Sequence, residues 1–509
     1  MQETGINKWH STTLSSYHYQ YFCRSLILGM EVQKIKKGNI IELAIQDIAF
    51  GGKGIAKIPT ADGEYIVFVL NTIPGQKVKA RIIKKKKRFA EAKVTEVLEQ
   101  AKDECKIPYQ AIPGAPFATW PVAKQQANKK TGTLEVLKRL GNIENTENLF
   151  DEFIASPSDW HYRNKMEYSF STIIWDDEQK TDIDDFGLGF KHRGQWRVVD
   201  NMHADSGLFD KQIEDNISTV RQWCINSELP AWHPVRHHGF YRFLTVRKSF
   251  YTGKVLFKLS TSSSHLEQFD TEGFVAMIKS FMGDRVAGII HTLNDGQGDR
   301  TQDEDLSSTV IYGEDNLEEK IHDLKFDVSI GSFFQPNPQS AELLYQKAID
   351  YTFLDQNFTE NDTIVDLFCG TGTIGQLVAN QAQGGVKVIG VDIIKSSIED
   401  AKKNAKKNGI KNLEFYAADV KNFLRDHPEY KGNIKTVILD PPRSGITPKA
   451  LKLIIELNAF RVVYISCNPA TQARDLQEFT AAGYHVKKIS IVDQFVHTAH
   501  VESVVLLQK

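Results

Sequence analysis

The sequence predicts an α/β protein with three domains. We expect a small β-barrel near the N-terminus, a central α+β domain, and a C-terminal domain with a doubly wound, largely parallel sheet. Three observations lead to this prediction. The length of 509 residues corresponds to about three domains at roughly 150 residues each. Residues 32–99 form short β-rich runs separated by glycine turns, and strand-like and helix-like segments alternate after residue 362. We place the boundaries at 1–31, 32–99, 100–330 and 331–509.

The composition excludes several classes of protein. Lys and Arg number 62 against 64 Asp and Glu, and 41% of the residues are hydrophobic, which excludes a wholly disordered or fibrous chain. No apolar run reaches the roughly 18 residues that a membrane helix needs, so we expect that the chain does not span a bilayer. We also expect no membrane among its partners. Five cysteines are too few for a disulfide framework, which favours the reducing cytoplasm.

Residues 1–31 show no sustained hydrophobic period, and a second methionine, Met30, stands near their end. We expect a flexible leader, or translation that begins at the later methionine, in preference to a structured element.

The predicted barrel, residues 32–99, is basic. Residues 31–100 hold 14 Lys or Arg against 8 Asp or Glu, whereas the whole chain has a net charge of −2. A basic excess on a small barrel favours binding to nucleic acid, although a charged strand edge that discourages aggregation is the alternative. The candidate RNA-binding residues are Lys84, Lys85, Lys86, Lys87 and Arg88.

The central segment, residues 100–330, is mixed, and its periodicity alone indicates no function. A helical stretch is expected at 131–140, and strand-like runs are expected at 168–174, 240–246 and 286–291.

The C-terminal segment has the rhythm of a parallel sheet with helical crossovers. A helix is expected at 396–408, and the final apolar run, 501–507, is expected to add an edge strand. The other predicted strands are 363–368, 386–391, 413–416, 436–439 and 461–465.

A glycine-rich loop follows the first of these strands. Gly370, Gly372 and Gly375 stand in a G-x-G-x-x-G pattern between a strand and a helix, where a ligand can approach the backbone. Asp392 ends the next strand, where a carboxylate can accept hydrogen bonds from a ribose. The pattern fits either a nicotinamide or flavin dehydrogenase or an S-adenosylmethionine methyltransferase, and a turn without a ligand is a further alternative.

The next motif favours the methyltransferase. Residues 439–445 read LDPPRSG after the fourth strand, at the edge where such sheets bind ligands. Two prolines give a rigid loop that directs Asp440 into the crevice. A dehydrogenase has no use for this loop, whereas a methyltransferase that acts on a nucleobase can place the base against it. An ordinary proline turn is the alternative.

Two residues at the same edge suggest a covalent mechanism. Cys467 follows the fifth strand and precedes Asn-Pro, although a free cysteine alone is more often a small buried apolar residue. Carbon 5 of uracil is a poor nucleophile, and addition of a thiolate to C6 turns it into an enolate-like carbon that can accept a methyl group. A base must then remove the C5 proton, and Glu502, at the start of the last apolar run, is a candidate. Cys224 and Cys369 are interpreted as structural.

Together these motifs resemble the RNA uracil-C5 methyltransferase family. The glycine loop, DPPRSGI, SCNPATQARDL and HTAHVE stand in the family's order over residues 330–509. Residues 161–167, HYRNKME, resemble its central-domain signature, and the barrel at 32–99 is similar to the TRAM domain of the branch that modifies ribosomal RNA. The resemblance covers all but the first thirty residues, and it implies a methyltransferase domain with a Rossmann-like sheet.

The resemblance also implies roles for individual residues. Cys467 would be the nucleophile and Glu502 the base, with S-adenosyl-L-methionine as methyl donor. The implied product is 5-methyluridine in 23S ribosomal RNA, and the alternatives are a tRNA uracil-C5 enzyme and an inactive RNA-binding protein. We expect a monomer. The residues at the family's cofactor positions are Gln335, Phe368, Gly370, Thr373, Asp392, Asp419 and Asp440.

One departure from the family concerns an iron–sulfur cluster. Many members hold a [4Fe–4S] cluster with four cysteines, but here only Cys105 occupies a ligand position. Ala111 and Gly114 stand at the next two positions, and the fourth falls near residues 203–204, where there is no cysteine. One thiolate cannot hold a cluster that needs four, so we expect no cluster and no metal.

Overall fold

The computed structural model describes residues 35–60, 63–298, 306–355, 358–382, 385–430 and 432–509. It divides into two compact units, with the boundary between Lys102 and Asp103. The leader expected at 1–31 lies outside the described residues. No helix within the described ranges is long and apolar enough to cross a membrane.

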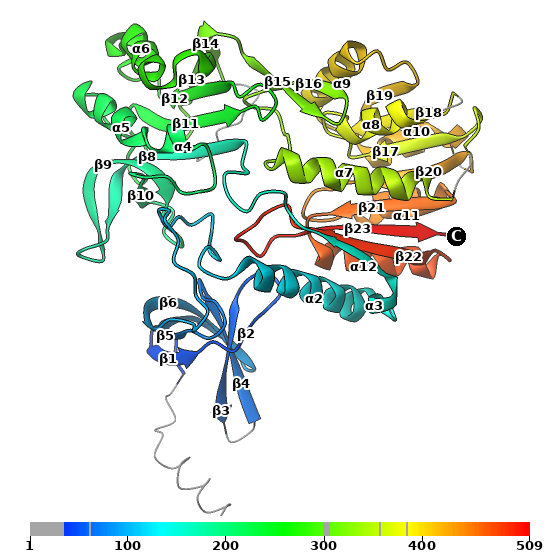
Figure 1. Ribbon diagram of the computed structural model, residues 1–509, viewed down its shortest axis with the longest axis horizontal. Helices are drawn as coiled ribbons and strands as arrows, with labels where there is room; N and C mark the ends of the chain where they lie inside the picture. The colour runs from blue at the N-terminus through cyan, green and yellow to red at the C-terminus, as the bar shows by residue number, and fades with distance from the viewer. Residues whose placement is uncertain (1–34, 61–62, 299–305, 356–357, 383–384, 431) are drawn as a thin grey trace, which may run out of the picture. The chain divides into compact units, whose positions relative to one another are not determined.

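The first unit is a six-stranded sheet around its own apolar core (Figure 1). Its strands alternate, as the buried Ile41 and Leu43 between exposed neighbours show. The alternation places one side chain in two in the core, which Val67, Val69 and Val78 complete. The order is β1-β5-β6-β4-β3-β2, with β1 (Ile40–Ala44), β2 (Asp47–Ile48), β3 (Gly54–Thr60), β4 (Gly63–Leu70), β5 (Lys77–Lys85) and β6 (Phe89–Glu99).

A seven-stranded sheet forms the centre of the second unit, in the order β10-β9-β8-β11-β12-β13-β14. Apolar residues on one face of its strands pack against helices α5 and α6 in a single core. The strands are β8 (Lys165–Asp176), β9 (Thr181–Lys191), β10 (Val199–Asn201), β11 (Tyr241–Lys248), β12 (Val255–Thr261), β13 (Val286–Leu293) and β14 (Ser308–Gly313). The helices are α4 (Lys211–Glu214), α5 (Ile217–Asn226) and α6 (Thr271–Met282), with short 3-10 turns η1 (Leu266–Gln268) and η2 (Gly283–Arg285).

The C-terminal part contains an eight-stranded sheet in the order β19-β18-β17-β20-β21-β23-β22-β7, parallel from β19 to β21. The hairpin β15 (Asn316–Ile321) and β16 (Leu324–Ser329) precedes it. The strands of the sheet are β17 (Thr363–Leu367), β18 (Lys387–Asp392), β19 (Leu413–Ala417), β20 (Ile434–Leu439), β21 (Arg461–Ser466), β22 (His485–Val492), β23 (Glu502–Gln508) and β7 (Phe150–Ile154).

Helices cover both faces of this sheet, as predicted. Neighbouring residues of one strand point to opposite faces: Ile364 packs with α7 and α8, whereas Val365 packs with α2, α10, α11 and α12. The helices are α2 (Val122–Gly141), α3 (Thr146–Leu149), α7 (Pro338–Phe353), α8 (Thr373–Gln381), α9 (Lys395–Lys407), α10 (Val420–Asp426), α11 (Pro448–Glu456) and α12 (Pro469–Ala481), with the 3-10 turn η3 (Pro428–Tyr430).

The position expected for the last strand is wrong. β23 lies inside the sheet, hydrogen-bonded to β21 on one side and to β22 on the other, and β7 forms the edge. All residues of β23 except Gln508 are buried. A strand buried on both faces reads as a continuous apolar run, which is why periodicity does not distinguish it from an edge strand. β7 pairs with β22 in the C-terminal sheet and α2 packs against one face of it, although the residues of both precede the central strands in the sequence (Figure 1).

Candidate active site

A cavity of about 700 Å³ lies at the carboxyl ends of β17, β18, β20 and β21. We call it the sheet-edge cavity. Ligands of parallel sheets bind at this edge because the strand-to-helix loops converge there. Eight of the nine predicted catalytic and cofactor residues line it: Gln335, Phe368, Gly370, Thr373, Asp392, Asp440, Cys467 and Glu502.

The glycine loop has the geometry that close approach of a ligand requires. Gly370 and Gly372 have positive φ angles of 53° and 72°, and Gly372 caps the N-terminus of α8. A Cβ on Gly372 would lie 2.4 Å from the Phe415 ring, so only glycine fits there. A Cβ on Gly370 would meet nothing within 4 Å, so the space beside its backbone is open to a ligand.

Two aspartates fix the ends of this loop. Asp392 accepts hydrogen bonds from the backbone N–H groups of Gly370 and Ile394, at 2.9 and 2.8 Å. The fully buried Asp366 accepts the Gly375 N–H at 2.9 Å. Burial, followed by the charge of Asp440, raises the pKa of Asp366 well above its ordinary value. The loop is therefore held from both of the strands that flank it.

The loops after β20 and β21 are joined to each other. The Asn468 side-chain amide donates to the Arg443 carbonyl at 3.0 Å, and Asn468 also caps α12. Asp475, on α12, accepts the Ile446 N–H at 3.0 Å and the Tyr464 hydroxyl at 2.7 Å. These contacts hold the proline-containing loop beside the cysteine loop. Burial raises the pKa of Asp440 to about 7.

The sheet places Cys467 beside Glu502. In the antiparallel pairing of β21 with β23, Ser466 lies opposite Ser503. Cys467 follows Ser466 and Glu502 precedes Ser503, so these two residues meet at the same end of the strand pair. Burial, then the charges of Glu502 and Asp440, raise the pKa of the Cys467 thiol to about 11, and Arg443 opposes this shift. The thiol is therefore protonated at neutral pH in the free protein, more fully than an ordinary cysteine.

Glu502 is almost fully buried, with 3% of its surface exposed. Burial, and then the charge of Asp440, raise its pKa well above the ordinary value, while Arg443 acts in the opposite direction. A carboxylate with a raised pKa binds a proton more strongly than one in water, which suits it to proton removal.

Comparison with known proteins agrees with this geometry. The family model described as tRNA (Uracil-5-)-methyltransferase matches residues 300–509, and the model of the TRAM domain matches residues 34–95. A Clostridium acetobutylicum protein named "Uncharacterized RNA methyltransferase" is 36% identical over 481 residues, which cover 93% of this chain and 99% of the relative. A Caldanaerobacter subterraneus protein with the same name is 35% identical over 477 residues, with the same coverage.

This chain belongs to the RNA uracil-5-methyltransferase family. The fold agrees: the crystal structure of the Pyrococcus abyssi tRNA (uracil-54, C5)-methyltransferase, in complex with S-adenosyl-L-homocysteine, matches with a TM-score of 0.67 at 23% identity, covering 92% of this chain and all of that one. The predicted fold class and the predicted family are confirmed.

In this RNA methyltransferase, several further residues of the cavity were not predicted from the sequence. Arg163, Phe333, Tyr345, Arg443 and Phe495 line it as well. Arg443 stands in the DPPRSG motif, Arg163 stands in HYRNKME, and Phe495 precedes HTAHVE by two residues. Phe333 stands two residues before the predicted Gln335. Their proximity to those motifs is the signal that could have found them.

Gln335 and the loop that leads to Glu502 are held by buried polar contacts. The Gln494 side-chain amide donates to Gln335 Oε1 at 3.4 Å, and Asn164 donates to the Gln335 carbonyl at 3.0 Å. In the same loop, Lys129 Nζ forms an ion pair with Asp493 at 2.6 Å and donates to the Phe495 carbonyl at 2.9 Å. Lys129 belongs to α2, so this helix, which lies near the start of the second unit in the sequence, contacts the backbone of Phe495 in the cavity wall.

Asp419 is the one predicted cofactor residue that does not line the sheet-edge cavity. It caps α10, and its side chain accepts the Asn422 N–H at 3.2 Å. Its place after β19 is still at the carboxyl end of the sheet.

The basic run lies in the first unit, at the end of β5 and in the turn to β6. All five side chains are exposed. Lys84 forms an ion pair with Glu91 at 3.3 Å, and the Tyr65 hydroxyl donates to the backbone carbonyls of Lys86 and Phe89, both at 2.7 Å. The turn that presents these charges is therefore fixed by Tyr65.

The segment around Cys105, where the family resemblance implies the position of a cluster, is held by hydrogen bonds. Gln110 Oε1 accepts the N–H groups of His203 and Ala204, at 2.9 and 3.0 Å, and Gln110 Nε2 donates to the Asn201 carbonyl at 2.8 Å. Cys105 is exposed, with Sγ 3.8 Å from the Asp103 carbonyl. In the ranges that the structure covers, no three His, Cys, Asp or Glu side chains form a group that could hold a metal ion.

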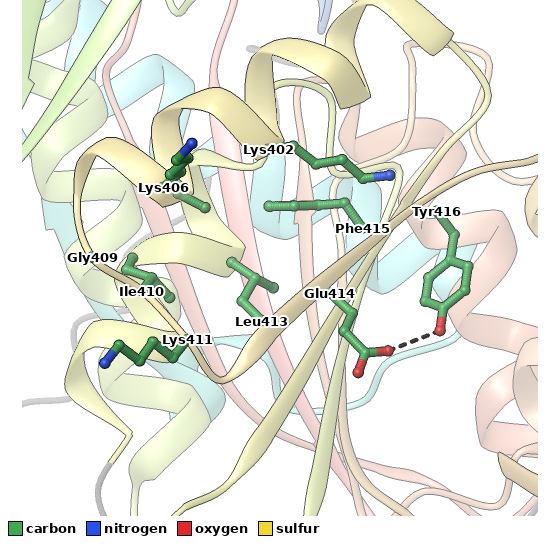
Figure 2. A pocket seen from close by; sticks show the side chains of 10 residues that line it. Lys402, Lys406, Gly409, Ile410, Lys411, Leu413, Glu414, Phe415 and Tyr416 are labelled. Carbon is green, nitrogen blue, oxygen red and sulfur yellow. Dashed lines mark hydrogen bonds between the residues drawn. The ribbon is translucent and has the colours of Figure 1, made fainter.

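Figure 2 shows a second hollow, between the end of α9 and the edge strand β19. Leu413 and Phe415 form its apolar floor, and Glu414 accepts a hydrogen bond from Tyr416 at 2.8 Å. None of the predicted catalytic or cofactor residues lines it. The predicted catalytic and cofactor residues therefore gather at the sheet-edge cavity and not at this hollow.

Proposed function

We propose that this RNA methyltransferase transfers a methyl group from S-adenosyl-L-methionine to carbon 5 of a uridine through a covalent adduct with Cys467. The observation that carries the proposal is the pairing of β21 with β23, which brings Cys467 and Glu502 to one cavity beside the glycine loop. A nucleophile, a base and a cofactor loop at one sheet edge are the parts that this chemistry needs.

The residues around the glycine loop fit the cofactor. The open space at Gly370 allows close approach to the backbone, and Asp392 and Asp440 are carboxylates that can accept hydrogen bonds from ribose or ammonium groups. Bound S-adenosyl-L-methionine would supply an electrophilic methyl group on a sulfonium. The residues that we assign to its binding are Gln335, Phe368, Gly370, Thr373, Asp392, Asp419 and Asp440.

The chain's own residues account for the remaining steps. The Cys467 sulfur adds to C6 of the uracil, and the C5–C6 electron pair moves into the enolate, which attacks the methyl group. The Glu502 carboxylate then takes the C5 proton, the C5–C6 double bond re-forms, and the carbon–sulfur bond breaks to release the thiolate. Because the resting thiol is protonated, its proton must first pass to another group, and the Asp440 carboxylate in the same cavity can accept it and return it to the thiolate that is released. Glu502 then remains unprotonated for the C5 proton.

We further propose that the substrate is 23S ribosomal RNA. The TRAM barrel supports this choice, because the sequence resembles the TRAM-containing ribosomal branch of the family. The basic run Lys84–Arg88 would contact RNA phosphates. We assign residues 32–99 to RNA binding, 100–330 to a central domain that also supplies α2 and β7 to the C-terminal sheet, and 331–509 to catalysis. We propose a cytoplasmic protein that acts as a monomer and carries no cluster.

The decisive experiment is to map 5-methyluridine in ribosomal and transfer RNA from a strain that lacks this gene. Loss of one modified uridine in 23S RNA, restored by the wild-type gene and not by a Cys467→Ala variant, is the expected result. Loss confined to transfer RNA would assign the enzyme to tRNA instead. An unchanged map of both RNAs would contradict the proposed activity.

A further inference from the structure

The central sheet has two faces of opposite character. Met166, Leu244 and Phe257 lie on the face that shares its core with α5 and α6. Because side chains alternate along a strand, their neighbours point to the other face. Charged and hydroxyl side chains cover much of that second face: Lys165, Glu167, Thr245, Arg247, Lys258 and Ser260.

Cations lie together on this second face. Arg247 on β11 lies directly opposite Lys165 on β8, and Thr245, two residues from Arg247, lies opposite Lys258 on β12. Like charges directly opposite each other destabilise a sheet. The acidic side chain on the same face is Glu167, which is exposed, opposite Thr245. Positive charge therefore exceeds negative charge on this part of the sheet.

Arg247 also has hydrogen-bonding capacity to spare. Its side chain is only 3% exposed, and Nη2 donates to the Ser332 carbonyl at 2.6 Å. Within the described part of the chain, Arg247 Nε and Nη1 have no hydrogen-bond partner, and the same holds for the buried hydroxyls of Thr245 and Ser260. The nearby acid Glu319 accepts the backbone N–H groups of Phe250 and Tyr251, at 2.8 and 2.9 Å.

Buried guanidinium N–H groups are normally paired, so unpaired ones beside other cations indicate a site for an anion. Burial, together with the charges of Arg247 and Lys258, lowers the pKa of Lys165 to about 7. A bound anion would remove this destabilisation of the Lys165 ammonium.

The location connects this cation cluster with the active site. Arg247 contacts Ser332, and the next residue, Phe333, lines the sheet-edge cavity. Lys258, Ser332 and Phe333 also line a neighbouring cavity of about 610 Å³. Phe333, Ile394 and Ser397 line both cavities, so the two adjoin each other.

We propose that Lys165, Arg247 and Lys258 bind a backbone phosphate of the RNA strand whose uridine enters the sheet-edge cavity. The inference rests on the proposed function, since it takes RNA as the substrate. A phosphodiester has two non-bridging oxygens that accept from a guanidinium and an ammonium together. The contact fixes the strand beside the cavity and contributes affinity that does not depend on base sequence.

The first test measures binding of a fluorescein-labelled single-stranded RNA with one uridine, at several salt concentrations. Lys165→Met keeps the aliphatic stem and removes the charge. We expect about tenfold weaker binding or more, as for the loss of a charged hydrogen bond, and a log–log salt slope smaller by about 0.7. The matched control is Lys279→Met, which removes the same charge from the exposed side of α6, where Lys279 lies 4.4 Å from the Tyr312 ring centroid. Equal affinity and slope in the two variants would overturn the proposal.

The second test identifies the phosphate. Single phosphodiesters of the same RNA are replaced one at a time by neutral methylphosphonates. Replacement of one linkage near the uridine should weaken binding to the wild type and leave binding to Lys165→Met unchanged. The reason is that the neutral linkage and the Lys165→Met substitution remove the same interaction. If every linkage affects both proteins equally, the cluster does not bind phosphate, and methylation of the RNA by the wild type shows separately whether the proposed function holds.

Discussion

At the residue scale, burial governs the ionisation of the side chains in the candidate active site. Cys467, Asp440 and Glu502 all have raised pKa values, and burial is the largest cause in each. In the proposed mechanism, addition to C6 needs Cys467 and orientation of the base, whereas release of the product needs a carboxylate to take the C5 proton.

The roles of Cys467 and Glu502 can therefore be separated. Glu502→Gln should methylate the uridine and then stall, so that a covalent protein–RNA species accumulates. Cys467→Ala should form neither adduct nor product, although it still binds RNA. A denaturing gel with labelled RNA and methyl-labelled cofactor measures both. Normal turnover by Glu502→Gln would mean that another carboxylate acts as the base, and Asp440 would be the next to test. Methylation by Cys467→Ala would refute the covalent mechanism.

The thiol pKa gives a second residue-scale prediction. With a pKa of about 11, alkylation of Cys467 by iodoacetamide should rise close to tenfold per pH unit between pH 7 and 9, because only the thiolate reacts. Arg443 lowers this pKa, so Arg443→Gln should slow the reaction at each pH. Mass spectrometry of the Cys467 peptide gives the rate. The control is Arg163→Gln, at another arginine that lines the same cavity, and it should leave the rate unchanged. If both variants slow alkylation equally, Arg443 does not specifically lower the pKa of the Cys467 thiol.

At the element scale, the loop between β22 and β23, residues 493–501, sets the position of Glu502. Two side chains of α2 hold it: Lys129 pairs with Asp493, and Gln125 accepts the His497 N–H at 2.9 Å. Tyr162 donates to the Val496 carbonyl at 2.9 Å, and Ser340 donates to the Asp493 carbonyl at 3.2 Å. The active-site geometry thus depends on helix α2, far away in sequence.

Lys129→Met should lower the free energy of unfolding by about 3–5 kcal/mol, because it leaves the buried Asp493 without its partner. Turnover should fall as well, since Lys129 also holds the Phe495 carbonyl at the cavity. Denaturant titration measures the stability. The control is Lys124→Met, also in α2, which removes a partially exposed ion pair between Lys124 and Asp103. It should change the free energy of unfolding by less than about 1 kcal/mol. If Lys129→Met lowers the free energy of unfolding by as little as Lys124→Met does, the buried pair of Lys129 and Asp493 is not important for stability.

A second element-scale prediction concerns the segment around Cys105. Hydrogen bonds of the Gln110 side chain connect it to residues 201–204, near the position that the family resemblance implies for the fourth cluster ligand. Protein purified without oxygen should be colourless and contain no stoichiometric iron or labile sulfide, because one cysteine cannot hold four irons. Iron and sulfide analysis is the measurement, and about four irons per chain would show that other residues act as ligands.

At the scale of the whole molecule, charge is distributed unevenly. The net charge is −2, yet the barrel is basic, and its exposed run lies on a turn fixed by Tyr65. Nucleic-acid affinity follows such local excesses more than the total charge.

Replacing Lys84–Arg88 with neutral residues should weaken RNA binding and reduce the log–log salt slope by roughly 0.7–0.9 for each phosphate that is no longer neutralised. The control removes five exposed lysines around α9, three of which border the hollow in Figure 2, and should have a smaller effect. These are Lys395, Lys402, Lys403, Lys406 and Lys411. Unchanged affinity and slope in the first variant would make the run a solvated strand edge.

Local sequence patterns were sufficient to predict several parts of the molecule. Alternation in strands such as β1 and β5, the crossover rhythm after residue 362 and the glycine loop are visible in neighbouring residues, because side-chain period and backbone conformation are local properties. The motifs around Asp440 and Cys467 follow in the same way. Most of the sheet-edge cavity could be assembled from them, since parallel strands end at a common edge.

Pairing between distant segments became visible only in the folded chain. β7, near residue 150, pairs with β22, near residue 490, and together they move β23 from the expected edge into the sheet. That placement buries Glu502 and brings it opposite the end of β21, beside Cys467. This burial also raises the pKa values of Cys467 and Glu502, and burial is a property of the packed sheet. Strand order and burial arise from contacts across hundreds of residues, and no local pattern encodes them.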